Sequence, residues 1–155
     1  LDCEEKDWDF SFDVNIKAMY FMCKAILPLM VKQNGGSIIN ISSIYGLVAP
    51  DMSIYEGSDF ETEPGYPFIK GGIISFSKYL SSYYSKKNVR VNCISPGGFF
   101  NNQEEPFLSK YIAKTPLGRM ASHDDIKGVA LFLASEASSY ITGSVIPVDG
   151  GWTAI

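Results

Sequence analysis

The chain has 155 residues, 46% of them hydrophobic, and a formal net charge of −4 at pH 7. This size and composition fit one compact domain with a sizeable core, and the scattered lysines and arginines exclude nucleic acid as the main partner. The three cysteines, Cys3, Cys23 and Cys93, are far apart and have no histidine nearby, so they form neither a zinc pattern nor a disulfide framework. We therefore expect reduced thiols in a cytoplasmic protein without a resident metal.

Residues 4–36 predict a long helix that Asn34-Gly35-Gly36 ends. Acidic residues crowd its start, which suits the positive end of the helix dipole. Apolar residues cover more than one face, so the helix should be buried on two sides or against a partner, and Pro28 should kink it or end its regular part. Its apolar run, 18–31, is interrupted by Lys24 and is too short to span a bilayer, so we expect no membrane partner.

Three short strands are predicted after this helix. A β-branched run over 38–41 predicts a strand buried on both faces. Alternating apolar residues over 89–93, followed by Pro-Gly-Gly, predict a second strand. The stretch 143–151 predicts a third, and Pro147 places it at or near a sheet edge.

Two further helices are predicted between these strands. Pro67 should occupy the first position of one helix, whose apolar stripe runs to Leu80. Ser122 should cap the other, whose stripe runs to Leu133. Residues 47–65 are polar and aromatic without a clear period, which is typical of a functional or flexible loop.

Helices that alternate with buried strands indicate an α/β fold with a parallel sheet covered on both faces. In such sheets, ligands bind beyond the carboxyl ends of the strands. Two stretches that follow strands, Ser42-Ser43 and Ser95-Pro96-Gly97-Gly98, should therefore lie on the functional edge.

A tyrosine precedes a lysine by four residues at three places, 20–24, 66–70 and 83–87. Only Tyr66 and Lys70 lie in the first turn of a helix that begins on the ligand side of the sheet. An ammonium beside a phenol favours the phenolate form, which suits a group that takes and returns a proton. We therefore regard Tyr66 and Lys70 as a candidate acid/base pair, and the other two as ordinary helix-surface pairs.

Ser43 has two possible roles. Its hydroxyl can donate or accept a hydrogen bond at a substrate oxygen, or the residue can simply end a strand in a turn. Ser42 should point to the opposite face of the strand.

Four stretches, NISSIYG, YPFIKGG, VRVNCISPGG and residues 116–151, resemble the short-chain dehydrogenase/reductase family, and the likeness extends over essentially the whole chain. The motifs that carry it are Asn15, Ser43, Tyr66 with Lys70, Pro96-Gly97 and Asp149-Gly150-Gly151. The resemblance implies a Rossmann-type doubly wound parallel sheet. It implies that residues 1–155 are the C-terminal part of a single NAD(P)-binding domain, with only the later strands and helices present.

The resemblance also implies an oxidoreductase that moves hydride between nicotinamide and a carbonyl/hydroxyl pair of a small-molecule substrate. Tyr66 would be the proton donor or acceptor, and Lys70 would support it. Ser43 would orient the substrate oxygen, and Asn15 would hold a water that links Lys70 to solvent.

The implied cofactor is NAD or NADP. Tyr66 and Lys70 would contact it, Lys70 through the nicotinamide ribose. Its nicotinamide would be bordered by Pro96, Gly97 and Gly98. Asn101 stands near the place of a cofactor-binding threonine of the family.

The sequence departs from the family pattern in three ways. No two of the 14 glycines are spaced as G-x-G, so the G-x-G-x-x-G phosphate turn is absent, and the chain opens with Leu1 rather than Met. From these two features we expect a truncated piece. The separation of Ser43 and Tyr66 is wider than usual in the family, and the extra residues, 51–65, would form a substrate loop. Pro67 disfavours a helical conformation at Tyr66.

The wide loop, the segment 101–111 and the DGGWTAI ending are most similar to family members linked to bacterial surface-sugar or flagellin-glycan synthesis, which implies a sugar derivative as substrate. The acidic loop would bind hydroxyls, or it is simply solvated. Family habit implies a homodimer or homotetramer of the full-length protein. The alternative function is that of a catalytically inactive half-domain that acts only in binding or assembly, because the phosphate cradle is missing.

Overall fold

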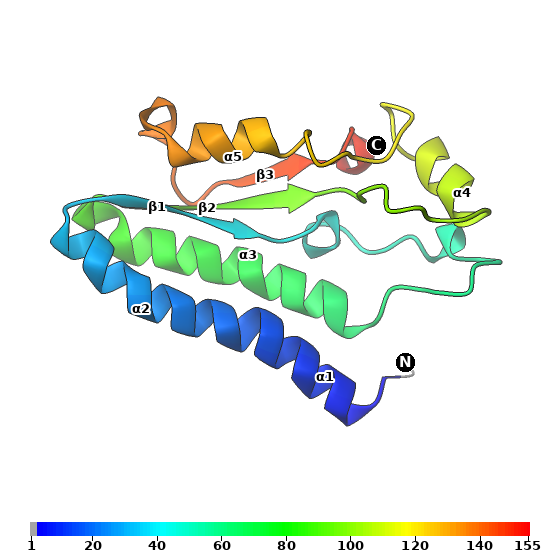
Figure 1. Cartoon of the computed structure of the whole chain (residues 1–155), viewed down its shortest axis with the longest axis horizontal. Coiled ribbons are helices and arrows are strands. Elements are labelled where there is room, and N and C mark those ends of the chain that lie inside the picture. The colour runs from blue at the N-terminus through cyan, green and yellow to red at the C-terminus, as the bar shows by residue number, and fades with distance from the viewer. Residues whose placement is uncertain (1–2) are drawn as a thin grey trace.

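A computed structural model describes residues 3–155 and contains a three-stranded parallel sheet with helices on both faces (Figure 1). The strands are β1 (Gly36–Ile41), β2 (Val89–Pro96) and β3 (Val145–Val148), in the order β1-β2-β3. Within the described residues 3–155, β3 pairs only with β2, which confirms the edge position predicted for Pro147. The predicted α/β fold with a parallel sheet is therefore confirmed.

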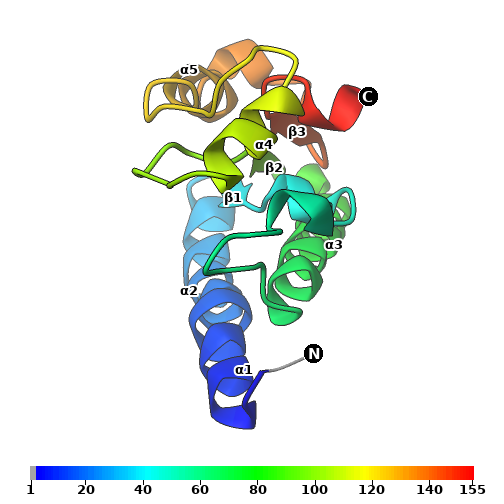
Figure 2. The same cartoon turned by 90° about the vertical axis from the view of Figure 1, so that its right-hand side faces the viewer.

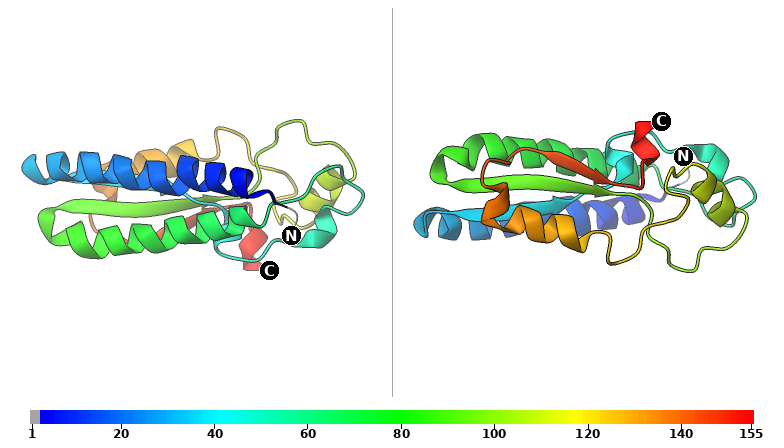
Figure 3. Two further views of the ribbon diagram at one scale, coloured as in Figure 1. Left: turned by 90° about the horizontal axis from the view of Figure 1, so that it is seen from below. Right: turned by 90° about the horizontal axis from the view of Figure 1, so that it is seen from above.

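Within residues 3–155, five α-helices and a π-helical segment accompany this sheet. α1 (Glu5–Phe12), the π-helical segment Asp13–Lys17 and α2 (Ala18–Lys32) form one continuous rod beside α3 (Gly65–Tyr84), on the same face of the sheet (Figures 1 and 2). α5 (Lys127–Ala134) covers the opposite face (Figure 3). α4 (Phe107–Ala113) lies beyond the carboxyl ends of the strands (Figure 1). α2 continues past Pro28, so the expectation that Pro28 ends the regular helix is wrong.

The apolar surface of the rod is mostly exposed. Cys23 and Leu27 are its buried residues within α2, whereas Phe21, Met22 and Leu29 are each more than half exposed. Among residues 3–155, the rod is therefore not buried on two sides, and its burial against a partner stays a prediction. By length and composition, the 28 residues Glu5–Lys32 are enough to cross a membrane, so the argument from the shorter apolar run is wrong.

Two helix starts differ from the prediction. α3 begins at Gly65, so Tyr66 is helical although Pro67 follows it. The first turn tolerates proline because the N–H groups there have no intrahelical acceptor. Ser122 does not cap α5, because its N–H and its hydroxyl both donate to Asp125 Oδ2 at 2.7 and 2.8 Å, and the helix begins only at Lys127.

The long loop before α3 is packed against α4. Ile54 is fully buried in a cluster that includes Phe107 of α4. Lys110 Nζ donates to the carbonyl oxygens of Ser53 and Glu56 at 3.0 and 2.8 Å. The loop is therefore held in place next to the carboxyl ends of β1 and β2.

Candidate active site

A cavity of about 350 Å³ opens at the carboxyl ends of β1 and β2, where the sequence predicted the functional edge. Six of the predicted site residues line it: Ser43, Tyr66, Lys70, Pro96, Gly97 and Gly98. Segments far apart in the sequence thus meet at one place.

The turn after β1 is docked on the first turns of α3. Ser42 Oγ donates to the carbonyl oxygen of Lys70 at 2.7 Å. A Cβ atom at Gly46 would lie 2.7 Å from the same oxygen, so only glycine permits this close approach. The docking places the buried Ser43 beside the Tyr66–Lys70 turn.

Of the two roles that the sequence left open for Ser43, the turn role is confirmed, and the role at a substrate oxygen stays a prediction. Ser43 Oγ accepts a hydrogen bond from the N–H of Tyr45 at 3.2 Å and so caps the short 3₁₀ helix Ile44–Gly46. A hydroxyl that accepts in this way keeps its O–H hydrogen for a ligand in the cavity.

Lys70 and Tyr66 face each other inside the cavity. The ammonium nitrogen of Lys70 lies 5.4 Å from the centre of the Tyr66 ring, and Tyr66 is 41% exposed. Burial lowers the pKa of Lys70, and a thiolate charge at neighbouring Cys93 would oppose this shift. Within residues 3–155, no carboxylate forms an ion pair with Lys70. Its charge is therefore available to the phenol and to a ligand.

The other two tyrosine–lysine pairs lie elsewhere. Lys87 sits 4.4 Å from the ring centre of the exposed Tyr83, and Lys24 lies over Phe21 rather than over its own tyrosine. Neither pair is among the residues around the cavity. The three tyrosine–lysine pairs share one spacing, but only Tyr66 and Lys70 line the cavity.

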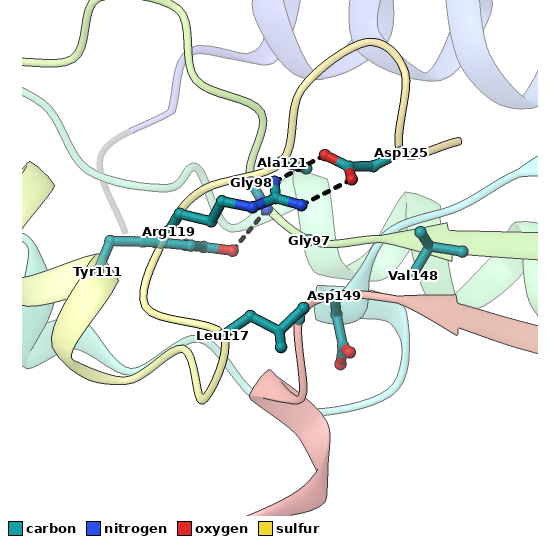
Figure 4. Close-up of a pocket in the computed structure, with 10 residues that line it drawn as sticks. Gly97, Gly98, Tyr111, Leu117, Arg119, Ala121, Asp125, Val148 and Asp149 are labelled. Carbon is teal, nitrogen blue, oxygen red and sulfur yellow. Dashed lines mark hydrogen bonds and ion pairs between the residues drawn. The ribbon is translucent and has the colours of Figure 1, made fainter. Parts of the chain in front are cut away.

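The turn after β2 must be built of glycine. The N–H of Gly98 donates to Tyr111 Oη at 2.5 Å, and a Cβ atom at Gly98 would lie 2.9 Å from Tyr111 Cζ and 2.8 Å from Met120 Cε. Figure 4 shows a second, smaller cavity, which shares Gly97, Gly98 and Tyr111 with the first and in which Arg119 holds Asp125 through two hydrogen bonds of 2.8 Å.

Two predicted residues lie outside the main cavity. Asn15 is in the π-helical segment, where its Nδ2 donates to the carbonyl oxygen of Ser11 at 2.9 Å, and it lines a neighbouring cavity. Ile41 lines both cavities. Asn101 is exposed and its N–H donates to Gln103 Oε1 at 2.7 Å. Gln103, rather than Asn101, reaches the main cavity.

Several cavity residues were not predicted from the sequence. Among them are four aromatic side chains from the segments between β1 and α3 and from α4: Tyr45, Tyr55, Phe107 and Tyr111. The aromatic richness of residues 47–65 was a local signal for Tyr55 alone, and the segments of the other three residues gave none.

The hydrogen-bonding groups that line the main cavity suit part of a dinucleotide. The Lys70 ammonium, which has no carboxylate partner among residues 3–155, lies in the same cavity as Pro96 to Gly98 and fits the hydroxyls and amide of a nicotinamide riboside. The sequence has no glycine-rich turn for the diphosphate. Among the residues that the structure describes, no group of three His, Cys, Asp or Glu side chains is placed to hold a metal ion.

Comparison with known proteins gives consistent matches. A family model described as enoyl-(acyl carrier protein) reductase matches residues 1–153. The chain is 43% identical over 152 residues to the 3-oxoacyl-[acyl-carrier-protein] reductase FabG of Chlamydia muridarum, which covers 95% of this chain and 57% of that protein.

Solved structures of dehydrogenases are also similar to this chain. A short-chain dehydrogenase from Leptospira borgpetersenii with bound NAD+ superposes with a TM-score of 0.92 at 38% identity, over 98% of this chain and 58% of that one. A gluconate 5-dehydrogenase from Burkholderia cenocepacia in complex with NADP and tartrate gives a TM-score of 0.89 at 27% identity, over 99% of this chain and 58% of that one. The chain thus spans little more than half the length of these proteins, and its predicted Rossmann-type fold is confirmed.

Proposed function

This chain belongs to the short-chain dehydrogenase/reductase family, and on that premise we propose that the protein carrying it is an NAD(P)-dependent oxidoreductase. It would interconvert a carbonyl and a hydroxyl group on a small-molecule substrate. The observation that carries the proposal is the meeting of Ser43, Tyr66 and Lys70 in one cavity at the carboxyl edge of the sheet.

The three side chains divide the proton chemistry between them. In reduction, the Tyr66 phenol donates its proton to the substrate oxygen, and in oxidation the phenolate removes it. The Lys70 ammonium stabilises the negative charge that Tyr66 carries after donation. Ser43 donates a hydrogen bond to the same substrate oxygen and so fixes its position. When bound, NAD(P) supplies or accepts the hydride at the substrate carbon.

Lys70 and Pro96 to Gly98 are the proposed contacts to the nicotinamide riboside. We retain Asn101 as a proposed cofactor contact at the exposed end of this turn. Asn15 is the proposed water-holding residue, and its position in a π-helical segment supports this, because such segments are frequent at functional sites.

We propose a sugar derivative as the substrate. Hydroxyl groups of Ser43, Tyr45, Tyr55 and Tyr111 line the cavity, which suits a substrate with several hydroxyls. Among the solved structures similar to this chain, one is a gluconate 5-dehydrogenase.

A second copy of the chain is the proposed partner, in a cytoplasmic homodimer or homotetramer. The rod of α1 and α2 exposes Phe10, Met22 and Leu29, and α3 beside it exposes Phe68 and Tyr79. Apolar patches of this extent on two adjacent helices are typical of protein interfaces. A second copy of the chain would cover these apolar side chains of the rod without a membrane.

The alternative is an inactive half-domain that acts only in binding or assembly. The absence of a glycine-rich phosphate turn from the sequence favours this for the isolated 155 residues, because that turn supplies most contacts to the diphosphate. Clear dinucleotide binding by the isolated chain would count against it.

The test is the oxidation of NADH or NADPH by the whole protein with a panel of sugar and simple carbonyl compounds. Tyr66→Phe should lower kcat/KM by about 100- to 10,000-fold. Tyr83→Phe is the matched control, because Tyr83 has the same spacing to a lysine but lies outside the cavity. The proposal fails if no compound is turned over with either nucleotide, or if the two variants behave alike.

A further inference from the structure

Two hydrogen-bonded phenols, Tyr45 and Tyr55, line the active-site cavity, and the proton transfer at Tyr66 uses neither. Their Oη atoms are 3.0 Å apart. The Tyr45 ring meets the Tyr66 ring edge-to-face, with 6.4 Å between the ring centres. Burial raises the pKa of both Tyr45 and Tyr55, so the pair consists of neutral hydroxyls at physiological pH.

The pair has unused hydrogen-bonding capacity. Two phenols carry two O–H hydrogens, and they use only one of these between themselves. Whichever phenol donates, one O–H and several lone pairs remain, and a ligand would share them with the Thr62 side chain, whose hydrogen bond lowers the pKa of Tyr55. A ligand group that both donates and accepts, such as a hydroxyl, matches this set.

Tyr55 comes from a loop that is packed against α4. The neighbouring Ile54 is fully buried, and the Tyr55 ring lies 5.4 Å from that of Phe107 in α4. Lys110 ties the loop to α4 through the carbonyl oxygens of Ser53 and Glu56. A ligand that uses Tyr55 therefore needs little reordering of the protein.

Apart from Lys70, which lies beside Tyr66, the basic side chains of α4 and of the segment after it that lie on this side of the sheet are neutralised among residues 3–155. Each is paired with a carboxylate: Lys114 with Asp51, Lys110 with Glu56, and Arg119 with Asp125. The phenol pair offers no positive charge either. An anionic group of a ligand would therefore find no free cation beside Tyr55, whereas a neutral hydroxyl finds a matched partner.

We propose that the Tyr45–Tyr55 pair binds a second hydroxyl of the substrate, separate from the oxygen that reacts at Tyr66. The site would then select small, uncharged, hydroxylated carbonyl compounds over alkyl ones. The cavity of about 350 Å³ is at the small end of ligand sites. An alkyl chain placed there would desolvate the pair without replacing its hydrogen bonds. The inference rests on the proposed function, because that function assigns the reacting oxygen to Tyr66.

The test uses the whole protein and matched cyclohexanones that carry either a hydroxyl or a methyl group at each ring position in turn. For each matched pair, kcat/KM with NAD(P)H and the Kd from ligand-observed NMR are measured. The variants are Tyr45→Phe, Tyr55→Phe and the control Tyr140→Phe, whose side chain is fully exposed.

At one or more ring positions, the native protein should prefer the hydroxyl compound by about 10- to 100-fold. Tyr55→Phe should remove most of this preference, and Tyr140→Phe should retain it. The inference is overturned if the native protein shows no preference, or if both Tyr45→Phe and Tyr55→Phe keep it. If no cyclohexanone is turned over, the Kd ratios still decide the role of the phenol pair, and the proposed function is decided separately by the panel of sugar and carbonyl compounds.

Discussion

Replacing Lys70 by methionine tests the electrostatic part of the mechanism. Unit charges 5.4 Å apart, the separation of the Lys70 nitrogen from the Tyr66 ring centre, attract each other by about 3 kcal/mol at an effective dielectric constant of about 20. Loss of that attraction corresponds to about 100-fold in rate. Because Tyr66 is 41% exposed, solvent reduces the effect, and we expect kcat/KM to fall by about 30- to 100-fold.

The assay is the pH dependence of kcat/KM for the whole protein with NAD(P)H and its best carbonyl substrate. Lys87→Met is the matched control, because Lys87 lies 4.4 Å from the ring centre of Tyr83 outside the cavity. Lys70→Arg keeps the charge and should recover part of the loss. A loss for Lys70→Met no greater than that for Lys87→Met would refute the electrostatic reasoning.

Three further predictions concern the frame of the site. Gly98→Ala should lower the free energy of unfolding by about 1–3 kcal/mol and lower kcat/KM, because the added Cβ would displace Tyr111. The control is Gly128→Ala, whose Cβ would have no atom within 4 Å. In chemical denaturation, this control should stabilise the protein by about 0.5–1 kcal/mol. Ser42→Ala should cost about 1 kcal/mol of stability and lower kcat/KM, since it breaks the hydrogen bond to the Lys70 carbonyl; unchanged kinetics would show that this docking does not set the site. Burial lowers the pKa of Lys70 in the folded protein. As the pH falls from about 10.4, Lys70 is therefore protonated in the unfolded chain before it is protonated in the folded protein, and this difference destabilises the folded protein. Lys70→Met should therefore be at least as stable as the native protein at pH 7, and any gain should shrink towards pH 10 in urea titrations.

The elements that could be predicted from the sequence have local signals. The isoleucines at 38–41 predict β1 by themselves, and the stripe that ends at Leu80 predicts α3. The candidate residues Ser43, Tyr66 and Lys70 follow from their places at a strand end and a helix start. Their meeting in one cavity follows from the parallel sheet.

The features that could not be predicted from the sequence depend on contacts between segments that are far apart in the chain. Tyr55 reaches the cavity because Lys110, far along the chain, holds its loop, and no periodicity reveals that contact. The π-helical segment around Asn15 has no local sequence marker that we recognise. The start of α5 was misplaced because Ser122 bonds to Asp125, a choice that the ion pair of Asp125 with Arg119 supports.

The central claim is that Tyr66 transfers the proton in a nicotinamide-dependent reaction. The most direct measurement is the single-turnover rate of NAD(P)H oxidation in the whole protein and in Tyr66→Phe, with the Kd of the nucleotide measured in parallel. The account predicts that the rate falls by at least about 100-fold while the nucleotide still binds. A Tyr66→Phe protein that turns over at the native rate would contradict it.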